Sequence, residues 1–303
     1  MSLAVKELLN IGKRQLEEYD IADAAIDSKM LYCYMMNVDN ARLILEYQRT
    51  LNDAQCEEYF GLLDRRCKGE PVQYIIGTQD FMGFTFKVNE NVLIPRQDTE
   101  TLVEDAISIL KENKLRNEEL PAKAKKEYEV LDLCCGSGAI GVSLAELCSN
   151  VKVTCSDLSR GALEVAKENA AAITKSKIEF KEGNLLEPFM KRFKKKKFDL
   201  IISNPPYIKS EVIPTLQREV KDFEPMMALD GGESGLDFYE RIVKDSTECL
   251  KKDGILMFEI GHDQKDDLIR IIEDTNKFSY VTGLKDLAGR DRIIVAVLES
   301  KKK

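Results

Sequence analysis

The sequence is poor in two residue types that often carry chemistry or binding. Its 303 residues include a single histidine, His262, and no tryptophan. One histidine excludes a histidine-rich metal site and argues against a Ser-His-Asp triad, so we expect no bound metal. His262 follows a strand-like segment, where we interpret it as a helix cap rather than a catalytic group.

Long apolar segments are also missing. No apolar run approaches the roughly 18–20 residues needed to span a membrane. The N-terminal residues MSLAVKELLN lack the basic stretch and apolar segment of a secretory signal. With 44% hydrophobic and 32% charged residues, the chain can nevertheless bury a core. We therefore expect a folded cytoplasmic protein without a membrane partner.

The cysteines lack the spacings of a metal or redox site. The chain has eight cysteines, and no CxxC pair occurs among them. Because the chain is long and shows no secretory signal, we do not expect a disulfide framework. We interpret these cysteines as buried, reduced thiols.

A strong excess of positive charge is absent as well. The chain has 45 Lys+Arg against 53 Asp+Glu, which gives a formal net charge of −8. This balance argues against nucleic-acid binding driven by the charge of the whole protein, so we expect no DNA partner. The local run KRFKKKK (191–197) is interpreted as a solvated loop, with a contact to RNA or to an acidic partner as the alternative.

Helical spacing dominates the first part of the chain, and we predict a helical domain over residues 1–72. Apolar residues recur on one face of successive segments between residues 5 and 47. A further helix is predicted after Asn52, where Gln55 completes a capping-box signal. Short connections between amphipathic helices indicate a small bundle.

Residues 73–92 are predicted to be a β-hairpin that links two domains. Its strands are expected at Gln73–Ile76 and Phe81–Val88, because apolar residues alternate at period two in the second segment. Asp98 is then a good N-cap for the first helix of a second domain, which spans residues 93–303.

Strands and helices alternate in this second domain, which predicts an α/β fold with a mostly parallel sheet and helices on both faces. Strands are expected at Glu129–Leu133, Val151–Ser156, Lys177–Phe180, Phe198–Ser203 and Ile255–Ile260. Helices are expected at Ala139–Leu147, Gly161–Ala171, Leu236–Leu250 and Gln264–Asp274. The final segments Tyr280–Leu284 and Ile293–Leu298 are predicted to pair as an antiparallel hairpin.

A glycine-rich turn follows the first of these strands in VLDLCCGSGAIG (130–141). Gly136, Gly138 and Gly141 have the G-x-G-x-x-G spacing, which lets a nucleotide-containing ligand approach the backbone at the end of a strand. Asp157 ends the next strand, where its carboxylate is placed to accept hydrogen bonds from ribose hydroxyls. The structural alternatives are a tight turn without a ligand and an N-cap role for Asp157.

These features fit both NAD and S-adenosylmethionine, and Asp132 helps to separate the two. It lies just before the turn in LDLCCGSG, which resembles motif I of class I S-adenosylmethionine-dependent methyltransferases more than a dehydrogenase fingerprint. After the third strand, the Asn184 amide is then expected to reach the adenine ring nitrogens. Leu185 is expected to give the adenine an apolar face.

The most specific feature is FDLIISNPPY (198–207), in which a strand runs into Asn204-Pro205-Pro206-Tyr207. Consecutive prolines are stiff and carry no N–H, so carbonyl oxygens near Pro205 are expected to project as acceptors. The Asn204 side-chain oxygen is a second acceptor, and two acceptors suit an –NH2 group. Tyr207 offers a ring that can stack on a planar amide or base and face a sulfonium cation.

This pair of acceptors addresses a definite chemical problem. An amide nitrogen or aromatic amine is a weak nucleophile because its lone pair is delocalised. Hydrogen bonds from both its hydrogens to fixed acceptors favour the charge that develops on nitrogen as a methyl group arrives. No strong base is needed before transfer, in agreement with the single histidine. The alternative is a proline turn that merely ends a strand.

The NPPY tetrad is shared by methyltransferases that act on DNA adenine, rRNA guanine and protein glutamine, and the flanking segments narrow this choice. Over most of its length the chain resembles the HemK/PrmC family of peptide chain release factor N5-glutamine methyltransferases. The segments that carry the resemblance are RRCKGEPVQYIIGTQDFMG (65–83), LIPRQDTETLVE (93–104), SNPPYI (203–208) and FEPMMALDGGESGLDFYERI (223–242).

The resemblance implies a class I, Rossmann-like methyltransferase fold with a small N-terminal helical bundle that docks the substrate. The implied reaction converts S-adenosylmethionine to S-adenosylhomocysteine and methylates N5 of the glutamine in the Gly-Gly-Gln motif of class 1 release factors. The implied cofactor residues are Asp132, Cys134, Cys135, Gly136, Ser137, Gly138, Asp157, Leu158, Asn184, Leu185 and Asn204.

For the substrate, the resemblance implies a glutamine pocket formed by the NPPY tetrad, in which Asn204, Pro205, Pro206 and Tyr207 are the catalytic residues. It also matches Arg96, Thr99 and Glu100 to the family's segment over the active site. The chain departs from the family pattern at Cys134 and Cys135, where Gly or Thr is frequent, and at Gln97, where Pro is frequent.

Three alternatives stay open at this stage. A closely related branch modifies a glutamine of a ribosomal protein. A nucleic-acid amine methyltransferase predicts a basic groove and a target-recognition insertion, and the sequence shows neither. A non-catalytic methyltransferase fold predicts loss of the glycine loop or of NPPY, and both are intact.

Overall fold

The structure, a computed structural model, describes residues 3–118, 127–190 and 196–299. The chain forms two compact units. Met1–Thr78 and Leu216–Phe223 make up the helical unit, and Gln79–Thr215 and Glu224–Lys303 make up the sheet unit. The predicted divisions after residues 72 and 92 stay predictions.

The assignment of residues 216–223 to the helical unit is a feature that the sequence did not indicate. These residues follow the NPPY segment along the chain and lie inside the predicted second domain, yet they pack with the N-terminal helices. The chain therefore crosses between the units three times, which makes the helical unit discontinuous in sequence.

Helices in the helical unit form where the apolar spacing predicted them. The capping box is complete, because Asn52 Oδ1 accepts from Gln55 N at 2.9 Å and Asn52 N donates to Gln55 Oε1 at 3.1 Å. Leu8, Leu31 and Tyr59 are fully buried in the core of this unit. Its elements are β1 (Leu3–Ala4), α1 (Val5–Glu18), α2 (Ala24–Met36), α3 (Asn40–Glu46), β2 (Thr50–Leu51), α4 (Asp53–Cys67), α5 (Val72–Ile76) and α9 (Arg218–Lys221).

The prediction of a strand at Gln73–Ile76 was wrong, because this segment lies in helix α5. Short apolar runs fit both periods equally well, and here Pro71 at the N-cap and Gly77 at the C-cap bound a helix. Gly77 has a φ of 78°, a left-handed conformation that ends a helix readily. The hairpin forms instead from β3 (Thr78–Phe81) and β4 (Phe84–Lys87).

A buried ion pair holds the helical unit together. Arg66 on α4 donates through Nε to Asp27 Oδ2 on α2 at 2.6 Å, and both side chains are only 5% exposed. The same guanidinium donates through Nη1 to the Glu70 carbonyl at 3.1 Å and pairs with Glu219 of α9. Arg66 thus fastens the returning segment 216–223 to the N-terminal helices.

We expect Arg66→Ala to lower the free energy of unfolding by about 3–5 kcal/mol, because it leaves the Asp27 carboxylate buried without its partner. Arg65→Ala is the matched control on the same helix. The ion pair of Arg65 with Glu70 is partly exposed, so its loss is expected to change stability by less than about 1 kcal/mol. Chemical denaturation of both variants checks the difference, and equal effects would contradict it.

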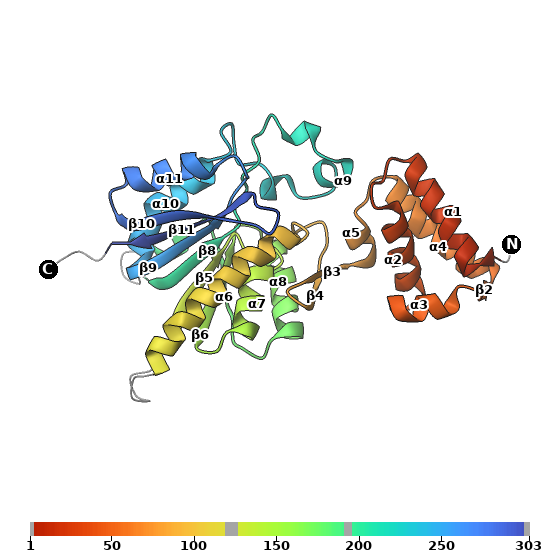
Figure 1. The fold of residues 1–303 in the computed structure, drawn as a ribbon, viewed down its shortest axis with the longest axis horizontal. Coiled ribbons are helices and arrows are strands. Elements are labelled where there is room, and N and C mark those ends of the chain that lie inside the picture. Colours follow the sequence, from red (N-terminus) through yellow and green to blue (C-terminus); the bar gives the residue numbers. More distant parts are fainter. Residues whose placement is uncertain (1–2, 119–126, 191–195, 300–303) are drawn as a thin grey trace. The chain divides into compact units, whose positions relative to one another are not determined.

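The main sheet of the sheet unit has seven strands in the order β10-β11-β9-β8-β5-β6-β7 (Figure 1). Neighbouring strands from β9 to β7 are parallel, and β11 and β10 add to them in antiparallel fashion. This arrangement confirms the predicted parallel sheet and the final hairpin. The strands are β5 (Tyr128–Leu133), β6 (Val151–Asp157), β7 (Glu179–Glu182), β8 (Phe198–Ser203), β9 (Leu250–Glu259), β10 (Phe278–Lys285) and β11 (Asp291–Leu298).

Helices cover both faces of this sheet (Figure 1). Side chains alternate along β5, so that Val130 packs with the layer of α6, α7 and α8 whereas Leu131 packs with the layer of α10 and α11. The helices are α6 (Gln97–Glu118), α7 (Ala139–Leu147), α8 (Arg160–Ile173), α10 (Asp237–Cys249) and α11 (Lys265–Asp274).

Asp98 does not cap α6 as predicted. The Arg96 carbonyl already accepts a hydrogen bond from Thr99 N at 3.1 Å, so helical bonding begins earlier and Asp98 lies inside the first turn. Its Oδ2 pairs instead with Arg292 of β11 at 3.0 Å. This contact ties the start of α6 to the antiparallel edge of the sheet.

The strand order locates the place where a ligand is expected. β5 has β6 on one side and β8 on the other, so the order of successive strands reverses at β5. In open α/β sheets, ligands bind outside the carboxyl ends of the strands at such a reversal. The glycine loop after β5, Asp157 at the end of β6 and Asn204 after β8 all lie at these ends.

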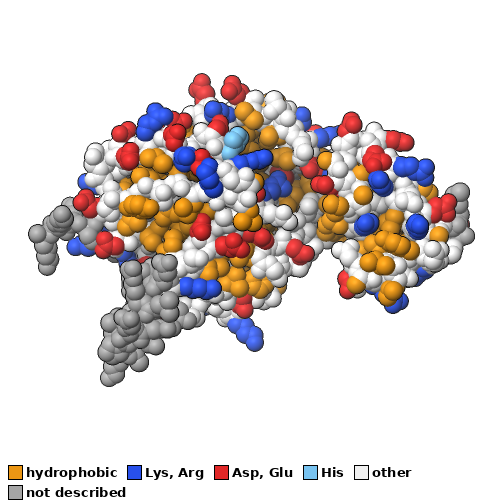
Figure 2. All heavy atoms as spheres, in the orientation of Figure 1, with side chains coloured by type: hydrophobic (Ala, Val, Ile, Leu, Met, Phe, Trp, Pro, Cys, Tyr) orange, Lys and Arg blue, Asp and Glu red, His pale blue; other side chains and the backbone are white. Residues whose placement is uncertain are grey.

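Three further features of the described residues bear on the sequence predictions. None of the helices in the described residues is long and apolar enough to cross a membrane. All eight cysteines are free thiols, and Cys33 and Cys134 are partly exposed while the others are buried. On the face shown in Figure 2, acidic and basic side chains are interspersed over both units rather than gathered by sign.

Candidate active site

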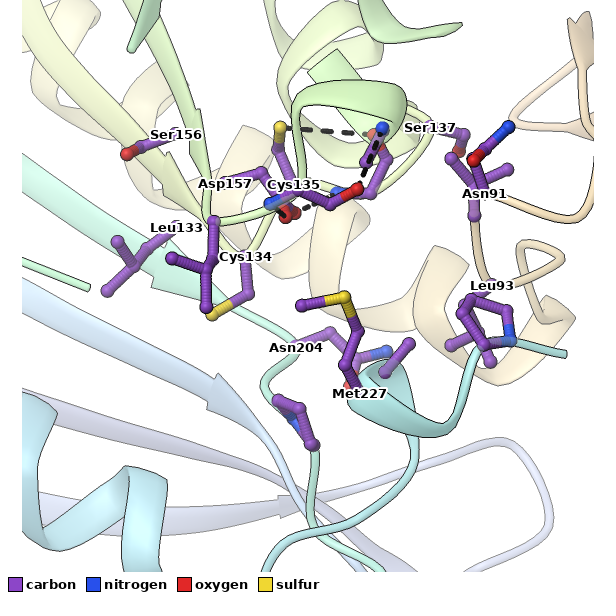
Figure 3. Close-up of a pocket in the computed structure, with 18 of the residues that line it drawn as sticks. Asn91, Leu93, Leu133, Cys134, Cys135, Ser137, Ser156, Asp157, Asn204 and Met227 are labelled. Atoms are coloured by element: carbon purple, nitrogen blue, oxygen red, sulfur yellow. Dashed lines mark hydrogen bonds between the residues drawn. The ribbon is translucent and has the colours of Figure 1, made fainter. Parts of the chain in front are cut away.

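A cavity of about 520 Å³ opens at the carboxyl ends of β5, β6 and β8 in the sheet unit. In Figure 3, Cys134, Asn204 and Met227 face its interior, and Asp157 lies deeper beside the glycine loop. Of the residues predicted for the site, the cavity wall contains Arg96, Thr99, Cys134, Cys135, Gly136, Ser137, Asp157, Leu158, Asn184, Leu185, Asn204 and Pro206.

The glycine loop turns sharply under this cavity. Cys134, Gly136 and Gly138 have φ values of 60°, 53° and 79°, which are left-handed conformations. Glycine adopts them freely, and at Cys134 they place a non-glycine residue under local strain at the cavity wall. Gly138 N closes the turn by donating to the Cys135 carbonyl at 2.8 Å.

Asp132 hydrogen-bonds the helix that follows the glycine loop and is absent from the described cavity wall. It is fully buried, and its Oδ2 accepts from Gly141 N at 2.8 Å. Burial raises the pKa of Asp132 to about 7, although the hydrogen bond from Gly141 opposes the shift. Its partner is therefore the start of α7, and its predicted contact with the cofactor stays a prediction.

The Asp157 carboxylate joins the glycine loop after β5 to the residues that lead into α8. Its Oδ2 accepts from Gly136 N at 2.9 Å, and its Oδ1 accepts from Ser159 N at 2.8 Å. Ser159 Oγ caps α8 by accepting from Ala162 N at 3.2 Å, so the alternative of an N-cap role for Asp157 was wrong. Burial raises the pKa of Asp157. Each carboxylate oxygen keeps a further lone pair for a ligand in the cavity.

The Asn184 side chain is held by neighbours on both of its polar atoms. Its Nδ2 donates to Glu187 Oε1 at 3.0 Å, and its Oδ1 accepts from Arg241 Nη2 at 3.0 Å. These bonds fix the amide, and the predicted contact with adenine ring nitrogens stays a prediction. Leu185 is buried against the cavity with a φ of 50°, which is an uncommon conformation for leucine.

Asn204 is the polar group that stands between the cavity and α6. β8 ends at Ser203, whose Oγ donates to the Leu133 carbonyl at 2.6 Å and holds the ends of β8 and β5 together. Asn204 Nδ2 then donates to Thr99 Oγ1 at 3.3 Å. In the described ranges no backbone N–H donates to the Pro205 carbonyl oxygen. Asn204 Oδ1 is thus an acceptor at the cavity wall, whereas Pro205 is buried outside that wall and its carbonyl oxygen stays a predicted second acceptor.

The segment LDGG (229–232) braces the NPPY backbone. Ile208 N donates to the Leu229 carbonyl at 3.0 Å, and Gly231 N donates to the Ile208 carbonyl at 2.8 Å. Gly231 packs so closely that a Cβ there would lie 2.7 Å from Tyr207 Cα, which no real side chain tolerates. Gln264 Nε2 holds the other side by donating to the Tyr207 carbonyl at 2.9 Å.

Besides Asp132, the predicted site residues Glu100, Gly138, Pro205 and Tyr207 are absent from the described cavity wall. The Tyr207 ring packs among the side chains of the α10–α11 layer, and its hydroxyl donates to Glu259 Oε1 at 3.4 Å. Glu100 accepts from Met82 N at 2.6 Å. Pro205 is absent from the described cavity wall, although Asn204 and Pro206 on either side belong to it. Their predicted roles stay predictions.

Sequence reasoning did not assign a role to the part of the cavity rim around Glu224, Met226 and Met227. Met226 and Met227 lie in a 3-10 turn (Met226–Ala228), line the cavity and are about half exposed, at 51% and 50%. The buried Glu224 accepts from Ile94 N at 3.2 Å and pairs with Arg96, so it joins two rim segments. These residues lie in the sequence FEPMMALDGG (223–232), but the spacing of its residues does not show whether the segment lines a cavity or forms an ordinary surface loop.

Most of the basic run KRFKKKK lies outside the described residues, which include only Lys196 and Lys197 of it. Lys196 Nζ contacts Glu179 Oε2 at 2.7 Å and Thr154 Oγ1 at 2.8 Å. Lys197 Nζ donates to the Leu250 carbonyl at 3.1 Å. The side chains of both lysines therefore contact other residues of the sheet unit.

Comparisons with known proteins agree across both units. Residues 7–77 match the PrmC N-terminal domain family, and residues 112–220 match the methyltransferase small domain family. A Release factor glutamine methyltransferase of Clostridium acetobutylicum is 39% identical over 272 residues, which cover 89% of this chain and 90% of that protein. A protein of the same name from Clostridium botulinum is 37% identical over 295 residues, which cover 97% and 99%.

Solved structures show the same fold at low identity. The hMettl16 catalytic domain in complex with MAT2A 3'UTR hairpin 1 has a TM-score of 0.54 and 12% identity, covering 82% of this chain and 81% of that chain. A human methyltransferase 10 domain containing protein has a TM-score of 0.50 and 16% identity, covering 72% and 88%. These likenesses confirm the predicted methyltransferase fold.

Proposed function

Because the chain belongs to the family of release factor glutamine methyltransferases, we propose that it methylates a release factor on glutamine. The acceptor is the side-chain amide nitrogen, N5, of the glutamine in the Gly-Gly-Gln motif of class 1 peptide chain release factors. The methyl donor is S-adenosylmethionine, and its product is S-adenosylhomocysteine. A substrate of this kind places the enzyme in the cytoplasm, where its free thiols stay reduced.

The cavity has the chemistry that this cofactor requires. Asp157 keeps acceptor lone pairs for the ribose hydroxyls after its bonds to Gly136 N and Ser159 N. Leu158 and Leu185 supply apolar wall for the adenine, and Cys134 lies at the wall beside the NPPY segment for the methionine part. When bound, S-adenosylmethionine supplies an electrophilic methyl group on a sulfonium centre.

The single observation that carries the proposal is the Asn204 amide at the cavity wall, directly after β8. Asn204 Nδ2 is engaged by Thr99, which leaves Asn204 Oδ1 to accept one N–H of the substrate amide. The Pro205 carbonyl oxygen accepts the other. With both hydrogens held, charge that develops on the amide nitrogen is stabilised without prior removal of a proton. The proton is lost after transfer, and no histidine is required.

The other substrates are not favoured. The relatives of this chain carry the name release factor glutamine methyltransferase over nearly its whole length. A nucleic-acid substrate requires a basic surface, and the visible face in Figure 2 mixes both signs of charge. We therefore expect no DNA partner and no required RNA contact.

Transfer of a labelled methyl group from S-adenosylmethionine tests this proposal. The purified full-length protein is incubated with a class 1 release factor, with the Gln→Ala variant of its Gly-Gly-Gln motif, and with DNA. We expect label in the wild-type release factor alone. Label in DNA, or equal label in the Gln→Ala variant, would show that the substrate is a different one.

A further inference from the structure

A buried asparagine on α8 joins two segments of the sheet unit and has no part in the function described so far. Asn169 is 1% exposed and is absent from the described cavity wall. Its Nδ2 donates to the Ser137 carbonyl in the glycine loop at 2.9 Å and to the Lys87 carbonyl at the end of β4 at 3.1 Å. Its Oδ1 accepts from Lys87 N at 2.7 Å. One side chain thus holds the glycine loop and the end of β4 together.

These three bonds fix the orientation of the Asn169 amide. Its –NH2 group faces two carbonyl oxygens and its oxygen faces an N–H, so each polar atom meets its complement. The reversed amide would place its oxygen against both carbonyl oxygens and its –NH2 group against the Lys87 N–H. The amide therefore has one favourable orientation, in which Ser137 and Lys87 are held at a fixed separation.

Both partners of Asn169 belong to segments that line the cavity. Ser137 itself lies in the cavity wall, within the glycine loop that follows β5. Lys87 ends β4, and the chain that follows it reaches the wall at Asn91 and Val92. Figure 3 labels Ser137 and Asn91 among the residues around the cavity. Asn169 therefore connects two separate parts of the wall from outside it.

Close packing along α8 supports the same connection. A Cβ at Gly138 would lie 3.1 Å from Ala166 Cβ, so the glycine loop rests tightly on α8. A Cβ at Gly161 would lie 2.8 Å from Asn91 Oδ1, so the segment after β4 also packs against this helix. These contacts prevent either segment from moving toward α8, and the bonds of Asn169 oppose movement away from it. The helix is a common support for both segments.

We propose that Asn169 is a positioning residue that holds the glycine loop in the shape that accepts the methionine end of S-adenosylmethionine. This inference rests on the proposed function above, which places that end of the cofactor against the loop. The adenosine end has other supports, because Asp157 is also fixed by Ser159 N and Leu185 follows β7. Loss of the Asn169 bonds should therefore weaken binding of the methionine end more than binding of the adenosine end.

Two ligands that differ at the methionine end separate this role from general stability. S-adenosylhomocysteine carries the amino acid end, whereas 5′-methylthioadenosine has the same adenosine and thioether sulfur without it. We expect Asn169→Ala to raise Kd for S-adenosylhomocysteine about 10-fold and to leave Kd for 5′-methylthioadenosine within about threefold of wild type. A merely structural role would raise both values by the same factor. Isothermal titration calorimetry of the full-length protein measures them.

Glu168→Ala is the matched control. Glu168 precedes Asn169 on α8, and its Oε2 pairs with Lys87 Nζ at 3.1 Å, so it also joins α8 to the end of β4. Both side chains are largely exposed, and Glu168 makes no hydrogen bond to the glycine loop in the described residues. Both Kd values should therefore stay at the wild-type level. A loss equal to that of Asn169→Ala would assign the effect to the link between α8 and β4 and would overturn the role of the Ser137 bond.

Hydrogen exchange of the wild-type protein gives a second readout that needs no variant. Lys87 is absent from the described cavity wall, but its N–H is bonded to Asn169. If Asn169 couples the two segments, S-adenosylhomocysteine should slow exchange of the Lys87 amide at least about threefold, and 5′-methylthioadenosine should slow it less. Protection of the glycine-loop amides without any change at Lys87 would contradict the coupling.

The proposal is overturned if Asn169→Ala weakens both ligands by the same factor, or if S-adenosylhomocysteine leaves exchange at Lys87 unchanged. Should Asn169→Ala fail to fold, the exchange measurement decides alone. Failure of the proposed function has a different appearance. A wild-type protein that binds S-adenosylhomocysteine but labels no release factor would contradict the proposed substrate and leave the role of Asn169 standing, whereas a protein that binds neither ligand would contradict both.

Discussion

Asn204→Ala is expected to lower the single-turnover rate of methyl transfer about 10²–10³-fold, the usual effect of removing one fixed group that stabilises a developing charge. The Asn204 side chain makes one long hydrogen bond, to Thr99 at 3.3 Å, so little of the fold depends on it. The free energy of unfolding is expected to fall by no more than about 1 kcal/mol. A large loss of rate with a small loss of stability is the signature of a group that acts on the substrate.

Rapid mixing of enzyme, cofactor and release factor measures this rate directly, and thermal unfolding of the same samples measures stability. Asn10→Ala on the exposed side of α1 is a control for loss of an asparagine side chain, and it should change neither quantity. An Asn204→Ala variant that transfers methyl groups at the wild-type rate would remove the observation on which the proposed function rests.

Asp157→Ala is expected to act on cofactor affinity rather than on the chemical step. A hydrogen bond to a charged group contributes about 1.5–3 kcal/mol, so loss of the ribose contacts should raise Kd for S-adenosylmethionine about 10- to 100-fold or more. Its bond to Gly136 N also shapes the glycine loop, and both effects weaken binding in the same direction. Isothermal titration calorimetry measures the change.

Asp199 supplies a matched control for Asp157. It also accepts a backbone N–H, from Glu129 at 2.8 Å, but it lies at the amino end of β8, away from the cavity. Asp199→Ala should therefore leave Kd unchanged, and equal losses for the two variants would show a general effect on folding.

The pH dependence of cofactor binding is a further check on Asp157. Burial raises the pKa of Asp157, so affinity is expected to fall as the pH drops and the carboxylate is protonated.

The sheet and the glycine loop could be predicted because their signals are local. The apolar strand at Val130, the turn from Gly136 to Gly138 and the NPPY tetrad each sit in one short stretch of sequence. Period-two and period-3.6 patterns then suffice to place the ends of parallel strands at one edge. The same logic failed at Gln73–Ile76, where four mostly apolar residues fit a strand and a helix alike.

The contacts that organise the site could not be predicted because they join distant parts of the chain. Thr99 meets Asn204 across 105 positions, and Tyr207 meets Glu259 across 52. Residues 216–223 return to the helical unit, where Glu219 pairs with Arg66, far earlier in the sequence. A single sequence shows which residue types are present, whereas the fold decides which of them meet.

Mass spectrometry of the methylated product tests the central claim most directly. A class 1 release factor is treated with the full-length protein and S-adenosylmethionine, digested, and fragmented across the Gly-Gly-Gln peptide. The account predicts a single added methyl group on the side-chain amide of that glutamine, and none after treatment with Asn204→Ala. A methyl group on any other residue, or an unmodified peptide after treatment with a protein that binds the cofactor, would contradict it.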